Sequence, residues 1–127
     1  QTKDLTITCQ NEHAVVLAVA LDDQPLAQSR RVLIQVGTPS RPKDWRVKPA
    51  TVTLEKSRVE GFVIEDYGKP PWMIEQPRVH VSLANTVLSR ATALDPNGMA
   101  SGRVVLKKEA GRVELAFPSN TISVILE

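Results

Sequence analysis

The side chains that could carry chemistry are few in this chain, and their spacing matches no metal-binding motif. The two histidines, His13 and His80, lie far apart in the sequence, without a neighbouring cysteine or a pair of carboxylates. Zinc sites usually show short spacings between their ligands. The sequence therefore predicts no metal site. His80 lies on the polar side of an alternating segment, so we expect a solvated surface histidine.

Two groups of carboxylates could in principle do other chemistry. Asp22 and Asp23 offer the oxygen ligands that calcium prefers, but they lie between two apolar runs, where aspartate favours a turn. Glu65, Asp66 and Glu75 could be imagined as the acid and base of a glycosidase, which needs two carboxylates across a cleft. A small chain of short strands offers no obvious cleft, and the sequence holds no nucleophile-elbow, P-loop or dinucleotide-binding motif. We therefore predict a protein that is not an enzyme and needs no cofactor.

The aromatic side chains are the best candidates for ligand binding, and they make up only 4% of the residues. Exposed rings can stack on the apolar faces of sugars while polar neighbours fix the orientation. The candidate carbohydrate-binding residues are three aromatic and two polar ones: Trp45, Tyr67, Trp72, Arg78 and His80. The alternative reading is that Trp45 and Trp72 plug the ends of the fold, where loops need large apolar side chains.

The basic residues around Trp45 allow a nucleic-acid reading. Arg41, Lys43, Arg46 and Lys48 flank the ring in the sequence, and basic residues interleaved with an aromatic can bind single strands. The formal net charge is only +2, however, and the Lys and Arg residues are scattered along the chain. No run approaches the ~20 apolar residues of a membrane helix. We therefore expect neither nucleic acid nor a membrane as a partner.

The elements that must position these side chains are strands. The segments Ala14–Leu21 and Arg31–Val36 are apolar runs with a period of two residues, separated by a polar stretch that opens with LDDQP. This pattern predicts two strands that pair as a hairpin, each with one buried face. The residues that share one parity are Val15, Leu17, Val19 and Leu21 in the first run, and Val32, Ile34 and Val36 in the second.

Other candidate strands follow, with turn signals between them. They are Leu5–Cys9, Val47–Leu54, Gly61–Glu65, Arg78–Leu83, Leu88–Leu94, Gly102–Lys107, Arg112–Phe117 and residues 122–126. About nine short strands without a convincing amphipathic helix predict an all-β fold, an antiparallel β-sandwich of immunoglobulin-like or jelly-roll-like type. We predict that the Pro-rich stretch Thr38–Pro49 and the stretch Tyr67–Trp72 are loops.

The length and composition predict one domain over residues 1–127. A chain of 127 residues with 42% hydrophobic residues can form its own core. Cys9 is the only cysteine, which excludes an intramolecular disulfide, and we expect its thiol to be buried in a strand. The chain has no initiator methionine and no signal-peptide pattern. We interpret it as a mature product or as a domain of a longer protein.

Four segments carry a resemblance to a known family. They are LDDQPLAQSRRVLIQVGT at residues 21–38, GKPPW at Gly68–Trp72, ALDPNG at Ala93–Gly98, and PSNTISVILE at residues 118–127. With these segments the chain resembles the C-terminal accessory β-sandwiches of large bacterial glycoside-hydrolase-like proteins. In that family the catalytic carboxylates belong to a separate barrel domain, and none of them has a counterpart here.

The resemblance implies a non-catalytic accessory module of a secreted or periplasmic protein. Its partner would be the catalytic domain of the same parent chain, which it packs against and stabilises. This reading predicts an exposed apolar patch where the neighbouring domain lies. Two alternatives stay open: a carbohydrate-binding module that uses exposed aromatic residues, and an adhesion or assembly module that acts through edge strands.

Overall fold

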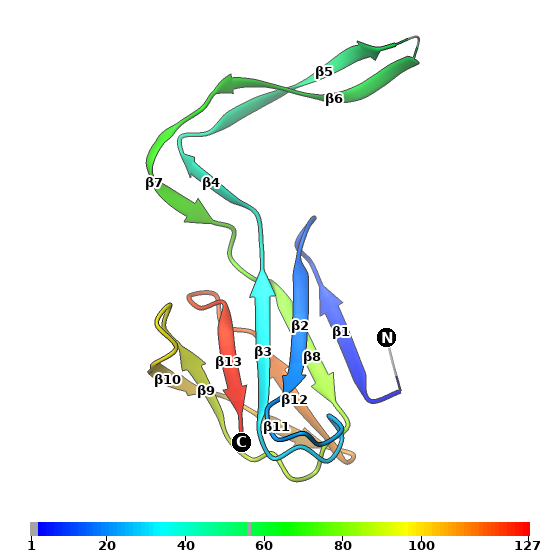
Figure 1. Ribbon diagram of the computed structural model, residues 1–127, viewed down its shortest axis with the longest axis vertical. Helices are drawn as coiled ribbons and strands as arrows, with labels where there is room; N and C mark the ends of the chain where they lie inside the picture. The colour runs from blue at the N-terminus through cyan, green and yellow to red at the C-terminus, as the bar shows by residue number, and fades with distance from the viewer. Residues whose placement is uncertain (1–2, 56) are drawn as a thin grey trace. The chain divides into compact units, whose positions relative to one another are not determined.

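The computed structural model describes residues 3–55 and 57–127, and in these residues it contains thirteen strands and no helix (Figure 1). All strand pairs are antiparallel. The all-β prediction is therefore confirmed, whereas the number of strands exceeds the nine expected. The chain divides into two compact units: residues 3–38 with 76–127, which we call the core unit, and Pro39–Glu75, which we call the hairpin insert. The prediction of a single domain over residues 1–127 stays a prediction.

The core unit contains two sheets. In spatial order, the first consists of β1 (Leu5–Cys9), β8 (Val79–Leu83), β12 (Arg112–Ala116) and β11 (Lys107–Glu109). The second consists of β10 (Ala100–Val104), β9 (Ala91–Leu94), β13 (Ser123–Leu126), β3 (Val32–Gly37) and β2 (Val15–Ala20). Strands distant in the sequence thus lie side by side, and this non-local pairing defines the unit.

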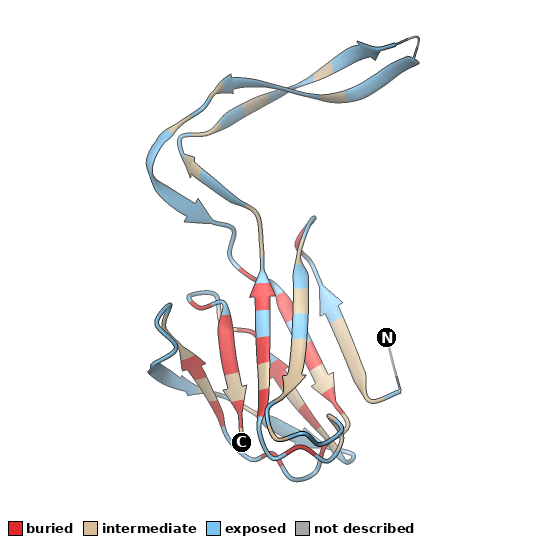
Figure 2. Ribbon diagram, viewed as in Figure 1, coloured by how far each residue is buried: buried red, intermediate tan, exposed pale blue. Residues whose placement is uncertain are grey.

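The hydrophobic core draws side chains from both of these sheets (red in Figure 2). The predicted parity of β3 is confirmed, because Val32, Ile34 and Val36 are all buried. The first sheet contributes one parity of β8 and of β12, including Val81 and Leu115. Full burial of such a side chain stabilises the fold by about 1.5–3 kcal/mol, so this cluster dominates the stability of the core unit.

The buried face of β2 is the opposite of the one that the sequence predicts. The strand pairs with β3 as expected, but Val16 lies opposite Val36 and Ala18 lies opposite Ile34. Directly opposed residues of an antiparallel pair share a face, so Val16 and Ala18 face the core. Val15 is 73% exposed instead of buried. The face of β2 that is buried is therefore set by its register with β3, and the size of the side chains in β2 does not decide it.

The connection between β2 and β3 is held by Asp22. One carboxylate oxygen accepts a hydrogen bond of 2.7 Å from the hydroxyl of Ser29, and the other accepts one of 2.7 Å from the backbone N–H of Arg30. These hydrogen bonds favour the ionised carboxylate and hold the pKa of Asp22 below its ordinary value. The aspartate thus stabilises the loop as a structural group, in agreement with its predicted turn role.

We expect the substitution Asp22→Asn to remove part of the acid sensitivity of the protein. Because the folded-state pKa is lowered, the stabilisation by Asp22 is present above the unfolded-state pKa of about 3.9 and is lost as the pH falls through the folded-state value. The thermal midpoint of the wild type should therefore fall more steeply below about pH 4 than that of the variant. Circular dichroism melts at a series of pH values measure this, and superimposable pH profiles would contradict it.

The hairpin insert contains β4 (Ser40–Lys43), β5 (Arg46–Leu54), β6 (Ser57–Asp66) and β7 (Lys69–Ile74). β4 pairs with β7 and β5 pairs with β6, so the chain forms one long interrupted hairpin. At its base the backbone N–H of Glu75 donates to the carbonyl oxygen of Pro39 at 3.0 Å.

The loop predictions for Thr38–Pro49 and Tyr67–Trp72 are wrong over most of their length, because these residues belong to β4, β5 and β7. Proline lacks a backbone N–H and is therefore excluded from central strands. Each strand of a two-stranded sheet has one free edge, where a missing donor costs nothing. Pro49 can thus lie within β5, opposite Phe62 of β6. For Val47–Leu54 the sequence predicts a strand, with Pro49 indicating an edge or an irregular entry in its first half, and β5 confirms this strand.

Candidate functional site

The hairpin insert exposes more large apolar side chains than the rest of the described chain. None of its described residues is buried (Figure 2). Its exposed large hydrophobic residues are Val52, Leu54, Val59, Phe62, Val63, Ile64, Tyr67, Trp72, Met73 and Ile74. Single exposed apolar residues are normal on soluble proteins, whereas a contiguous series of this kind marks an interaction surface.

One apolar cluster lies on a single face of the β5–β6 ribbon. Val47 lies opposite Ile64, and Pro49 lies opposite Phe62 two residues further along. Opposed residues share a face, and residues two positions apart along a strand do as well. The four side chains therefore form one continuous patch, which we call the first cluster.

A second apolar cluster lies on the other face of the same ribbon, towards the turn. Val52 lies opposite Val59, and Leu54 follows on the same face of β5. Ala50 and Gly61 are opposed on this face too. A hollow of about 440 Å³ lies at this point of the ribbon, and residues of both faces line it, Pro49 and Phe62 as well as Ala50 and Gly61. The ribbon therefore offers apolar side chains and a concave stretch, which can accept projecting side chains of another surface.

Six charged side chains of the hairpin insert pair with one another. Three ion pairs cross the hairpin, Arg46–Asp66 at 3.2 Å, Lys48–Glu65 at 3.3 Å and Lys69–Asp44 at 3.6 Å. Exposed pairs of this kind contribute only about 0–1 kcal/mol each. Their effect here is on the surface charge, since two of the four basic residues around Trp45 are neutralised by neighbouring carboxylates.

Two of the predicted ligand-binding residues, Trp45 and Tyr67, lie together where β4 and β7 meet β5 and β6. Their ring centroids are 5.8 Å apart and their planes are nearly perpendicular, at 85°. This edge-to-face arrangement is favourable for aromatic pairs. The guanidinium of Arg41 lies 5.8 Å from the centroid of the Trp45 ring. The buried indole N–H of Trp45 has no hydrogen-bond acceptor among the described residues.

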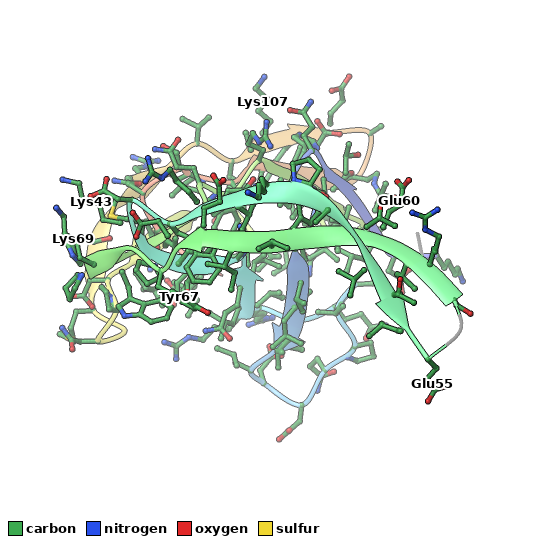
Figure 3. The ribbon with its side chains drawn as sticks, turned by 90° about the horizontal axis from the view of Figure 1, so that it is seen from above. Lys43, Glu55, Glu60, Tyr67, Lys69 and Lys107 are labelled. Carbon is green, nitrogen blue, oxygen red and sulfur yellow. The ribbon has the colours of Figure 1, made fainter. Side chains whose placement is uncertain are left out.

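The same junction depends on Gly68, whose role the sequence analysis did not single out. Gly68 has a φ of +67°, and its N–H donates to the carboxylate of Asp66 at 2.8 Å. A Cβ atom at this position would lie 2.4 Å from the carbonyl oxygen of Lys43. Figure 3 shows Lys43 and Lys69 side by side next to this junction, and Glu55 at the turn of the hairpin. Asp66 lies two residues before Gly68, and aspartate followed by glycine is typical of turns. This signal could have indicated that the position requires glycine.

The other predicted site residues lie in both units. Trp72 belongs to β7, opposite Pro42, and its side chain is 67% exposed, so the reading that it plugs the end of the fold is wrong. Arg78 and His80 belong to the core unit. The backbone N–H of Arg78 donates to the side-chain oxygen of Asn11 at 2.7 Å. His80 is exposed, as expected, and its Nε2 lies 4.0 Å from a carboxylate oxygen of Glu114.

Neither the family models nor the curated proteins nor the solved structures give a match to this chain. The resemblance to glycoside-hydrolase-like accessory domains therefore stays a prediction.

Over residues 3–55 and 57–127, the side chains of histidine, cysteine, aspartate and glutamate form no group of three or more that could hold a metal ion. In the same residues we find no long apolar helix of the kind that crosses a bilayer. Cys9 is exposed, contrary to the prediction of a buried thiol, because it ends the edge strand β1.

Proposed function

We propose that this chain is a non-catalytic β-sandwich module, immunoglobulin-like or jelly-roll-like, that docks onto a neighbouring protein domain through its hairpin insert. The exposed apolar surface of the insert is the observation that carries this proposal. A two-stranded hairpin alone is at best marginally stable in water, so a covering surface would stabilise it. The sandwich assignment is supported by the two sheets of the core unit, which share one hydrophobic core.

The chemistry of the hairpin insert favours a protein surface as its partner. Its exposed large apolar side chains are mostly aliphatic, and such side chains gain free energy by burial against other apolar surface. The insert carries seven Lys and Arg residues against six Asp and Glu residues, so it offers little net positive charge to a polyanion. With the resemblance of four sequence segments, this chemistry supports the catalytic domain of a secreted or periplasmic glycoside-hydrolase-like parent protein as the partner.

Thiol labelling of the full-length gene product tests this proposal. In a Cys9→Ser background, Phe62→Cys and Val59→Cys place one thiol on each face of the ribbon. We expect these thiols to react about tenfold or more slowly in the full-length product than in the isolated 127-residue chain, because the partner domain covers them.

Glu109→Cys, an exposed position in the core unit, is the matched control and should react at the same rate in both proteins. Equal labelling rates at both hairpin positions in the two proteins would refute the docking role.

Assembly through edge strands is a second candidate function, and β2 favours it. This strand lies at the edge of its five-stranded sheet, and both Val15 and Leu17 are exposed on its outer face. Exposed apolar edge strands readily pair with strands of another chain. Sedimentation of the isolated chain as a strict monomer at high concentration would contradict this second function and leave the docking proposal unaffected.

A further inference from the structure

A cavity of about 500 Å³ lies in the core unit between β10 and the end of β12. Small-molecule sites usually have volumes of about 300–1,000 Å³. The space exists because β11 is short and pairs only with Arg112–Glu114, so that it does not continue along Ala116. Small residues enlarge it, since Ala93, Ser101 and Gly102 also line the cavity. No atom lies within 4 Å of the place where a Cβ of Gly102 would be.

The cavity is rich in hydrogen-bond donors without partners. Arg103, Lys107 and Asn120 line it, and within the described part of the chain none of these side chains has a hydrogen bond or an ion pair. Lys107 lies directly opposite Glu114 in the register of β11 and β12. Glu114, with His80 at 4.0 Å, supplies the acceptor groups of the cavity. A ligand that fits must therefore bring a negative charge for the two cations, together with smaller polar groups.

The remaining lining is aliphatic. Val104, Val105 and Pro118 form the apolar part, and the lining includes no phenylalanine, tyrosine or tryptophan, so that the His80 imidazole is its one aromatic ring. Val105 is 76% exposed, which is unusual for valine and leaves apolar surface open to a ligand. Flat bases bind by stacking on aromatic side chains, whereas aliphatic walls suit the C–H groups of a saturated ring.

We infer that this cavity binds a sugar acid, a saturated ring that carries hydroxyl groups and one carboxylate. Arg103 and Lys107 bind the carboxylate, since charge-assisted hydrogen bonds to guanidinium and ammonium groups are stronger than neutral ones. Asn120, His80 and Glu114 bind hydroxyl groups. All residues that line the cavity belong to the core unit. This inference therefore does not depend on the proposed docking function of the hairpin insert.

Titration of the ¹⁵N-labelled chain with D-glucuronate, followed by NMR, tests this inference. We expect the amide signals of Ser101–Val105 and Ala116 to shift, and D-glucose to bind about tenfold or more weakly, because it lacks the carboxylate. Arg103→Gln should weaken glucuronate binding by about tenfold, and Ala116→Leu should abolish it by filling the cavity. Lys108→Gln is the matched control, because Lys108 does not line the cavity and its ammonium lies 3.4 Å from the Thr86 carbonyl oxygen.

Three results would overturn the inference. The first is a titration in which glucuronate shifts none of these amides. The second is equal affinity for glucose and glucuronate, which would show that Arg103 and Lys107 do not bind the carboxylate. The third is an equal loss of affinity in Lys108→Gln and Arg103→Gln. This result would show that the net charge of the protein attracts glucuronate without a specific contact to Arg103. The ¹⁵N spectrum of each variant reports its folding in the same experiment, and Arg103→Lys should recover part of the affinity if charge at this position is required.

Discussion

Replacement of Asn85 by leucine is expected to destabilise the protein by about 3–5 kcal/mol, a large part of the stability of an ordinary domain. Asn85 is only 2% exposed, yet every hydrogen-bonding group of its amide is used. The NH₂ group donates to the carbonyl oxygens of Leu26 and Ser29, both at 2.8 Å. The side-chain oxygen accepts from the N–H groups of Val87 and Leu88 at 2.8 and 3.1 Å. This one side chain therefore joins two loops that are distant in the sequence.

The cost arises because leucine leaves four backbone groups without these partners, and the bonds to the Ser29 carbonyl oxygen and the Leu88 N–H are fully buried. Each unsatisfied buried group costs about 1–3 kcal/mol before relaxation. Urea denaturation followed by circular dichroism measures the loss. Asn97→Leu is the matched control, because Asn97 is exposed in a turn, and its change should stay within about 0.5 kcal/mol. A loss of less than about 1 kcal/mol for Asn85→Leu would show that water replaces the missing partners.

Gly68→Val is expected to open the junction of the hairpin insert while the core unit stays folded. The left-handed conformation at a φ of +67° is costly for valine, and the added Cβ would approach two backbone atoms, the Lys43 oxygen at 2.4 Å and the Trp45 nitrogen at 2.9 Å. The backbone must therefore shift, which separates Trp45 from Tyr67. Limited proteolysis within the insert should become about tenfold faster, since cleavage follows the population of the open form.

Gly61→Ala is the control for this substitution. Gly61 lies in the same insert, but no atom is within 4 Å of the added Cβ. The urea midpoint of the core unit should change little in either variant, because the core cluster contains no residue of the insert. Unchanged proteolysis of Gly68→Val would contradict the steric argument, and a large drop in the urea midpoint would contradict the independence of the core unit.

The two units thus differ in how their apolar residues are used. In the core unit, alternating strands bury one parity against each other and the other parity faces solvent. In the hairpin insert, strands of similar composition have only one neighbour each. The proposed docking function follows from this difference, because burial that the insert does not achieve by itself can be completed by another protein.

The candidate aromatic residues show how much of the candidate sites can be predicted from side-chain types alone. Trp45, Tyr67 and Trp72 were selected as rare rings in polar surroundings, and all three belong to the exposed insert. The cavity on the core unit was not predicted, apart from His80. Its lining comes from five strands and two connecting segments between residues 80 and 120, and a set spread so widely has no local sequence signature.

By itself, the sequence determined the all-β class, the pairing of the strands within residues 14–36 and the buried parity of β3, because these depend on local alternation and on turn residues. Only the tertiary structure decided which face of β2 is buried, that the proline-rich stretches form strands, and that Pro39–Glu75 is a separate unit. The physical reason is that alternation describes a single strand, whereas burial depends on its neighbours. Those neighbours come from distant parts of the chain, and in the hairpin insert each strand has only one.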